Sequence, residues 1–142
     1  TTTVQQMWAP LGVRLKIEQV DSATRTARYR ARDYQMRTSA WTNDISDPSQ
    51  ITSYFAYSPN IDNLYSGWKD ERVDRLYEAS GKEIDATKRA AIFREIQERY
   101  VAQAPILFLY ETPYPVAFRK NAQGFVQIPL GNNLFEGAYV AR

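Results

Sequence analysis

The sequence predicts an α/β fold, in which helices cover the faces of a sheet, and two observations support this class. Extended apolar segments alternate with amphipathic helical segments along the 142 residues, which is typical of layered α/β proteins. Residues 106–110 are apolar on both faces, as expected for a central strand that is covered on both sides. A chain of this length can bury a proper core, so we expect residues 1–142 to form a single domain.

The first half of the chain is expected to contain three helices and two strands. An opening helix has one apolar face and ends at Gly12, because glycine is typical of a helix end. Residues 13–18 alternate between apolar and charged side chains, which predicts a strand. Asp21 can cap a second helix through its carboxylate. Residues 33–41 resume an extended pattern, and one or two helical turns are expected over residues 51–57.

The second half is expected to contain two helices before the strand at 106–110. Residues 58–68 are rich in turn formers and predict a surface loop. A helix is expected over about residues 69–80, and a longer one follows Asp85. The expected buried stripe of that longer helix is Phe93, Ile96, Tyr100 and Val101. Short extended pieces are expected near residues 116–118 and 125–128.

The composition excludes several classes of function. The chain has no His and no Cys, which removes imidazole bases, thiolate nucleophiles, disulfides and zinc sites built from nitrogen or sulfur. Neither a Gly-x-Gly phosphate loop nor a Gly-x-Ser-x-Gly elbow occurs. The net charge of +2 is too small to indicate a nucleic-acid partner. The longest apolar run is far shorter than the ~20 residues of a membrane span. We therefore expect a protein that is not an enzyme and holds no cofactor or metal.

The segment Trp41-Thr-Asn-Asp-Ile-Ser-Asp-Pro48 carries the most informative chemistry. It follows a predicted strand and precedes a helix, which is where ligands of open α/β sheets collect. Asp44 could bind an ammonium group through charge-assisted hydrogen bonds, or it could be the first residue of an Asx-turn. Asp47 is better explained as the N-cap of a helix that begins at Pro48. The segment indicates capture of a cation or amine rather than a bond-making reaction.

Two other interpretations of the sequence compete with this one. Asp44 and Asp47 could form an acid/base pair as in glycosidases, but any two acids a few residues apart would satisfy that spacing. A basic run with interleaved aromatic residues could instead form a nucleic-acid-binding module. The run consists of Arg25, Arg28, Arg30, Arg32 and Arg37, with Tyr29 and Tyr34 between them. A solvated helix face is the more ordinary meaning of such a run.

Six short runs, in this order, resemble the last third of bacterial extracytoplasmic solute-binding proteins. They are Leu11-Gly-Val-Arg-Leu-Lys-Ile17, Asp33-Tyr-Gln-Met-Arg37, Ala40-Trp-Thr-Asn-Asp-Ile-Ser-Asp-Pro48, Trp68-Lys-Asp-Glu-Arg-Val-Asp-Arg-Leu76, Ala86-Thr-Lys-Arg-Ala-Ala-Ile-Phe-Arg-Glu-Ile-Gln97 and Ala104-Pro-Ile-Leu-Phe-Leu-Tyr110. The family resembled is family 5, the oligopeptide, dipeptide and nickel-binding type that supplies ABC importers. The resemblance extends over about residues 2–128.

This resemblance implies a periplasmic-binding-protein-like lobe with a mixed central sheet flanked by helices. The chain would be a fragment, the C-terminal lobe of a two-lobed clamp whose N-terminal lobe is missing. In peptide-binding members, a strand ends in a Trp, and an Asp three residues later takes the α-ammonium group of the peptide. By this resemblance Asp44 takes the ammonium role and Trp41 the platform role. Backbone contacts to the ligand are assigned to Ala40, Thr42 and Asn43.

The resemblance also implies the partners and the compartment. The expected partners are a short peptide or related small solute, a membrane permease of the ABC transporter, and the missing N-terminal lobe. The expected location is the periplasm, or the outer face of a membrane as a lipoprotein. Family members also take nickel chelates, opines or sugars, which remain alternative ligands. Because small-ligand pockets bury ~70–90% of the ligand, half a cleft is expected to bind weakly or not at all.

Overall fold

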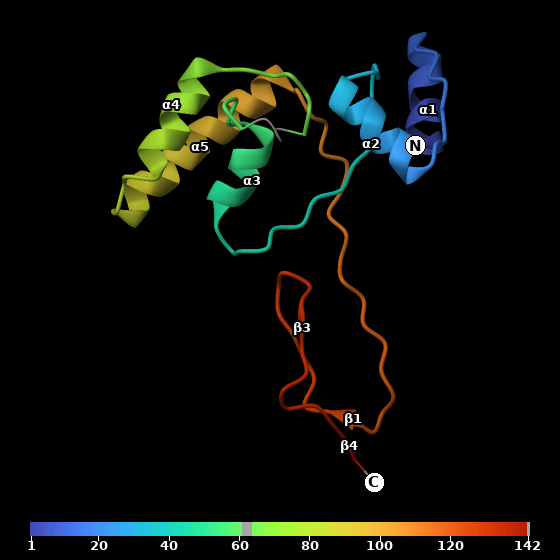
Figure 1. Cartoon of the computed structure of the whole chain (residues 1–142), viewed down its shortest axis with the longest axis vertical. Coiled ribbons are helices and arrows are strands. Elements are labelled where there is room, and N and C mark those ends of the chain that lie inside the picture. The colour runs from blue at the N-terminus through green and yellow to red at the C-terminus, as the bar shows by residue number, and fades with distance from the viewer. Residues whose placement is uncertain (61–63, 142) are drawn as a thin grey trace.

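The computed structural model describes residues 1–60 and 64–141, and residues 61–63 of the predicted loop lie outside this part. Within it, five α-helices and one short 3-10 helix precede four two-residue strands (Figure 1). The helices are α1 (Thr2–Trp8), η1 (Ala9–Leu11), α2 (Ser22–Ala31), α3 (Pro48–Phe55), α4 (Glu71–Ser80) and α5 (Ala86–Gln103). The strands are β1 (Ala122–Gln123), β2 (Val126–Gln127), β3 (Asn133–Leu134) and β4 (Tyr139–Val140).

Four helices begin at an aspartate whose carboxylate accepts hydrogen bonds from backbone N–H groups of the first turn. These N-caps are Asp21, Asp47, Asp70 and Asp85, and such bonds satisfy N–H groups that have no partner inside the helix. The N-cap interpretation of Asp47 is therefore confirmed. Gly12 ends η1 in the left-handed conformation, with φ of 81°, as the sequence predicts.

The buried core lies where α3, α4 and α5 pack side by side (Figure 1). It consists of Phe55, Ala56, Val73, Leu76, Ile96 and Tyr100. Ile96 and Tyr100 confirm half of the predicted stripe of α5, but Val101 is 60% exposed. The prediction for Val101 is wrong because each residue turns the helix by about 100°, which carries the side chain after Tyr100 away from α4.

The predicted strands at 13–18, 33–41 and 106–110 have no ladder partner among the described residues. A strand is defined by hydrogen bonds to a neighbouring strand, so an extended segment alone does not count as one. The sheets that form are two antiparallel pairs, β1 with β4 and β2 with β3. The described chain thus combines helices with small antiparallel sheets, and the mixed central sheet is not assembled within it.

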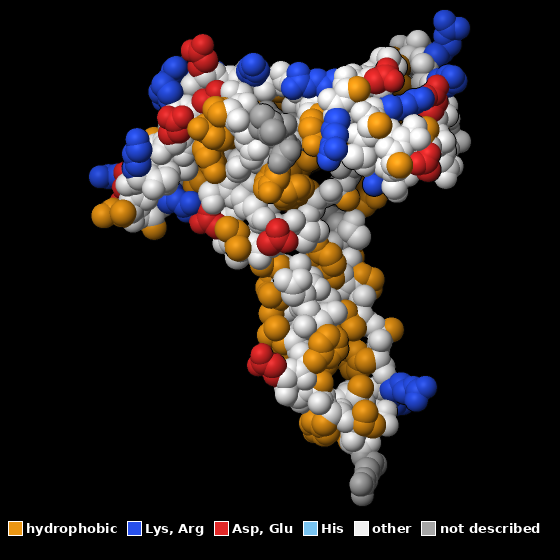
Figure 2. Space-filling view, viewed as in Figure 1, with side chains coloured by type: hydrophobic (Ala, Val, Ile, Leu, Met, Phe, Trp, Pro, Cys, Tyr) orange, Lys and Arg blue, Asp and Glu red, His pale blue; other side chains and the backbone are white. Residues whose placement is uncertain are grey.

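The burial predicted for residues 106–110 also differs from the structure. Leu107, Phe108, Leu109 and Tyr110 are each more than half exposed, from 54% to 82%. Within the described part of the chain, this segment has no neighbouring strand, and it is not covered on both sides. It leads from α5 into an extended C-terminal arm, residues 106–141, that runs away from the helices (Figure 1). Hydrophobic side chains gather on the visible face of this arm (Figure 2).

None of the helices in the described ranges is both long enough and apolar enough to cross a membrane.

Candidate ligand-binding site

Trp41 is anchored to α3 by its indole ring. The ring lies 4.5 Å from that of Tyr54 and 5.5 Å from that of Phe55, measured between centroids. Its Nε1 donates a hydrogen bond of 2.9 Å to Oδ1 of Asn43. Trp41 is half-buried, so part of its ring packs on the core and part faces outward. Aromatic contacts of this kind contribute about 0.5–1.5 kcal/mol beyond area burial. They hold the start of the segment against α3.

Asp44 is exposed, and its hydrogen-bond partner is the side chain of Gln50 in the first turn of α3. Nε2 of Gln50 donates to Oδ2 of Asp44 at 2.8 Å. Oε1 of Gln50 accepts from the backbone N–H groups of Asp44 at 2.7 Å and Ile45 at 3.2 Å. The turn is therefore closed by a residue from the following helix rather than by an Asx-turn of Asp44 itself.

Asp47 has a structural role. Besides capping α3, its carboxylate accepts two hydrogen bonds of 2.9 Å from the guanidinium of Arg89 on α5. The pKa of Asp47 lies well below its usual range because Arg89 and then Ser49 donate hydrogen bonds to the charged form. Arg89 also donates to the backbone oxygen of Ser80 at 3.2 Å and lies over the ring of Phe93. The segment is thereby tied to the helical core at its C-terminal end.

The remaining predicted residues lie along an extended strip. Ala40 and Thr42 are exposed, and Asn43 is half-buried. The hydroxyl groups of Thr42 and Tyr114 are 2.6 Å apart, which joins this strip to the C-terminal arm. Among the described residues, no hydrogen bond involves the backbone groups of residues 40–43. The strip can therefore pair with an added extended chain.

The basic run is engaged in contacts within the chain. The guanidinium of Arg37 lies 4.2 Å from the ring centroid of Tyr29 and 5.6 Å from that of Tyr34, and it donates to the backbone oxygen of Leu64. Arg28 forms an ion pair of 2.8 Å with Glu18. The two tyrosines thus stack on arginine, an arrangement that favours a structural role over a free platform for bases.

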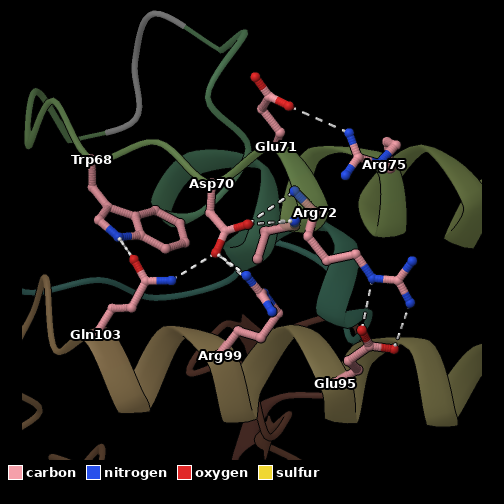
Figure 3. A network of polar contacts seen from close by, with 9 residues as sticks. Trp68, Asp70, Glu71, Arg72, Arg75, Glu95, Arg99 and Gln103 are labelled. Atoms are coloured by element: carbon pink, nitrogen blue, oxygen red, sulfur yellow. Dashed lines mark hydrogen bonds and ion pairs between the residues drawn. The ribbon is translucent and has the colours of Figure 1, made fainter.

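A second polar cluster joins α4 to α5 at the level of the core (Figure 3). The side chain of Asp70, only 7% exposed, accepts from Arg99 at 2.8 Å and from Gln103 at 2.6 Å. Burial raises the pKa of Asp70, but hydrogen bonds from Arg99, from backbone N–H groups and from Gln103 outweigh it, so the net pKa is lowered. Oε1 of Gln103 in turn accepts from the indole of Trp68 at 2.9 Å. This cluster holds α4 against α5, and α4 in turn packs against α3, which carries part of the candidate site.

Sequence reasoning missed three residues of this neighbourhood. Gln50 carried a weak signal, because it stands three residues after the Asp47 N-cap, at the spacing of a capping box. Arg89 and Tyr114 carried none, since each meets the segment only through the fold. Within residues 1–60 and 64–141, no group of three or more acidic side chains is placed to hold a metal ion.

Comparison with known proteins shows similarity to one class of protein. Residues 1–63 match the profile of bacterial extracellular solute-binding proteins, family 5 Middle. The solved structure of HbpA2 from Haemophilus parasuis superimposes with a TM-score of 0.75 at 27% identity, covering 99% of this chain and 28% of that one. The α/β fold is therefore that of a periplasmic-binding-protein lobe.

Curated relatives agree with this class. The probable D,D-dipeptide-binding periplasmic protein DdpA of Escherichia coli is 26% identical over 127 residues, or 88% of this chain and 25% of the relative. The oligopeptide-binding protein OppA of Bacillus subtilis is 26% identical over 137 residues, which is 96% of this chain and 25% of the relative. The chain spans about a quarter of the length of these relatives. The chain is therefore similar to family 5 bacterial extracellular solute-binding proteins, through the family profile over residues 1–63 and through these relatives over most of its length.

Proposed function

We propose that the chain is the C-terminal lobe of a larger two-lobed solute-binding protein, which captures a short peptide or similar amine-bearing solute for an ABC importer. The match of residues 1–63 to the family 5 profile supports solute binding, and relatives that the chain matches are named for dipeptides and oligopeptides. The extent of the match, about a quarter of each relative, supports a role as one part of a larger protein. Clamp closure over the ligand would then supply the remaining walls of the pocket.

The observation that carries the peptide proposal is an exposed carboxylate beside a strip of unpaired backbone. Oδ1 of Asp44 accepts no hydrogen bond from the described residues, because Gln50 takes only Oδ2. An α-ammonium group placed there would gain charge-assisted hydrogen bonds. The backbone of Ala40, Thr42 and Asn43 would pair with the peptide as an added strand, and the outer part of Trp41 would form the platform.

The proposal places the protein outside the cytoplasm, in the periplasm or attached to the membrane as a lipoprotein. Its partners would be the N-terminal lobe and a membrane permease. Its role is capture and delivery, so it needs no catalytic residue. An acid/base pair of Asp44 and Asp47 is disfavoured, because the carboxylate of Asp47 is paired with Arg89.

Native mass spectrometry of the full-length protein that carries this chain tests the proposal. We expect short peptides to copurify and to vanish in Asp44→Ala, because removal of one partner of a desolvated charge pair costs roughly 2–5 kcal/mol. Asp33→Ala is the matched control, since Asp33 is also exposed but lies outside the segment.

Peptides retained by Asp44→Ala would keep the receptor function and move the anchor elsewhere. A copurifying sugar, opine or nickel chelate would keep solute transport and reject the peptide. A protein that is empty and binds no added peptide would contradict the proposed ligand class.

A further inference from the structure

Gln50 makes contacts that a helix start does not require. Asp47 begins α3 and Gln50 is the third residue of that helix, the spacing at which a capping-box side chain reaches back to the N–H of the N-cap residue. Its Oε1 instead extends further, to the N–H groups of Asp44 and Ile45. The side chain is therefore used to shape the segment that precedes the cap.

The orientation of the Gln50 amide is determined by its partners. Oε1 must face the two backbone N–H groups, because only oxygen can accept from them. Nε2 then necessarily points at Oδ2 of Asp44, where the distance is 2.8 Å. One carboxylate oxygen is thus held by Gln50, and Oδ1 is left without a partner in the described part of the chain.

The chemical character of this partner matters as much as its position. Asp47 and Asp70 each pair with an arginine, which offsets their negative charge. Asp44 is held by a neutral amide, which restricts its orientation without pairing it with a resident cation among the described residues. A carboxylate in this state is suited to a ligand that brings its own positive charge, because no resident cation competes for it.

The segment is also held at its far end. The two hydrogen bonds from Arg89 to Asp47 fix the C-terminal end to α5, and Gln50 fixes the middle of the segment, at Asp44 and Ile45, to α3. Because Asp44 and Asp47 are both held, little of the chain around Asp44 is free to move. Pre-organisation of this kind lowers the ordering cost of binding.

We infer that Gln50 is the positioning residue for Asp44, and that it tunes selection for ligands with a free amino group. This inference rests on the proposed ammonium role of Asp44. Gln50 does not touch the ligand; it presents a charged, oriented Oδ1 to it. Loss of Gln50 would therefore weaken recognition of the amine more than binding of the rest of the peptide.

The test compares two peptide libraries on the full-length protein. One is a tripeptide library with free amino termini, and the other is the same library after N-acetylation, both titrated by native mass spectrometry. The variants are Gln50→Met, which keeps length and helix propensity but removes the amide, and Gln50→Asn, which keeps the amide on a shorter stem. Gln97→Met, exposed on α5, is the matched control, and thermal unfolding without ligand reports the folded fraction.

We expect Gln50→Met and Gln50→Asn to weaken binding of the free-amine library by about tenfold, the net effect of roughly one hydrogen bond. Binding of the acetylated library should change less than about twofold, so the selectivity ratio falls. A merely structural role would lower both affinities by the same factor, and that result would overturn the inference.

Two further outcomes separate this inference from the proposed function. Unchanged selectivity in both Gln50 variants, with binding lost in Asp44→Ala, would reject the role of Gln50 and keep the receptor. Unchanged binding in Asp44→Ala, or no binding of either library by the unaltered protein, would reject the ammonium anchor and with it this inference.

Discussion

Two aspartates in one short segment have different roles because their neighbours differ. Asp47 receives the guanidinium of Arg89 and an N-cap hydrogen bond, and so serves the fold. Asp44 receives only a neutral amide and stays exposed. Residue type alone does not separate these roles, although the Asp-Pro sequence correctly indicates the N-cap. Partner identity decides which carboxylate remains available.

At the residue scale, the lowered pKa of Asp47 predicts a pH dependence of stability. Because the pKa is lower in the folded than in the unfolded protein, the charged carboxylate stabilises the fold above the ordinary Asp value of 3.8. This stabilisation is lost as the pH falls below that value towards the folded pKa.

The free energy of unfolding should therefore differ most between wild type and Asp47→Asn near neutral pH, and the difference should shrink in acid. Urea unfolding at a series of pH values measures it. Arg89→Met should cost about 1–3 kcal/mol at neutral pH, whereas the exposed Arg94→Met should have little effect. A difference between wild type and Asp47→Asn that grows in acid would contradict the assignment.

At the element scale, the packing of α4 against α5 provides the support for the candidate site. Val73 of α4 is fully buried between these helices, and the Asp70 cluster closes the same interface with polar contacts (Figure 3). Asp70 both caps α4 and accepts from α5, so one side chain sets the start of one helix and its contact with the other. Stability of this interface determines whether α3, and with it Gln50, stays in place.

The interface predicts a contrast between two valines. Val73→Ala should destabilise the protein by roughly 2 kcal/mol, because a buried side chain is lost and the cavity closes only in part. Val101→Ala should stay within about 0.5 kcal/mol, since Val101 is 60% exposed. Chemical denaturation of both variants gives the comparison, and equal losses would contradict the observed orientation of α5.

At the scale of the whole molecule, much of the chain's apolar surface is exposed. The helical core carries the candidate site, and the C-terminal arm extends from it with apolar side chains exposed (Figures 1 and 2). Phe118 and Phe135 are 63% and 64% exposed, which is far more than a finished core tolerates. This surface agrees with a chain that spans about a quarter of its relatives.

The isolated chain, residues 1–142, is therefore expected to bind peptides weakly or not at all. A ligand on the strip at residues 40–43 would remain largely in water, whereas small-ligand pockets bury ~70–90% of the ligand surface. Isothermal titration with tri-alanine should show no micromolar binding by the chain alone. The full-length protein serves as the positive control, and micromolar binding by the isolated chain would contradict the two-lobed proposal.

The sequence by itself determined the helices, three of their aspartate caps, the resemblance to family 5, and the Trp41-to-Asp44 segment as the candidate site. These features depend on neighbouring residues, whose propensities and capping bonds act locally. Only the tertiary structure decided that Arg89 engages Asp47, that Tyr114 meets Thr42, and that the extended segments at 13–18, 33–41 and 106–110 stay without ladder partners. The physical reason is that ion pairs, ladder hydrogen bonds and burial depend on residues distant in sequence, which local patterns do not specify.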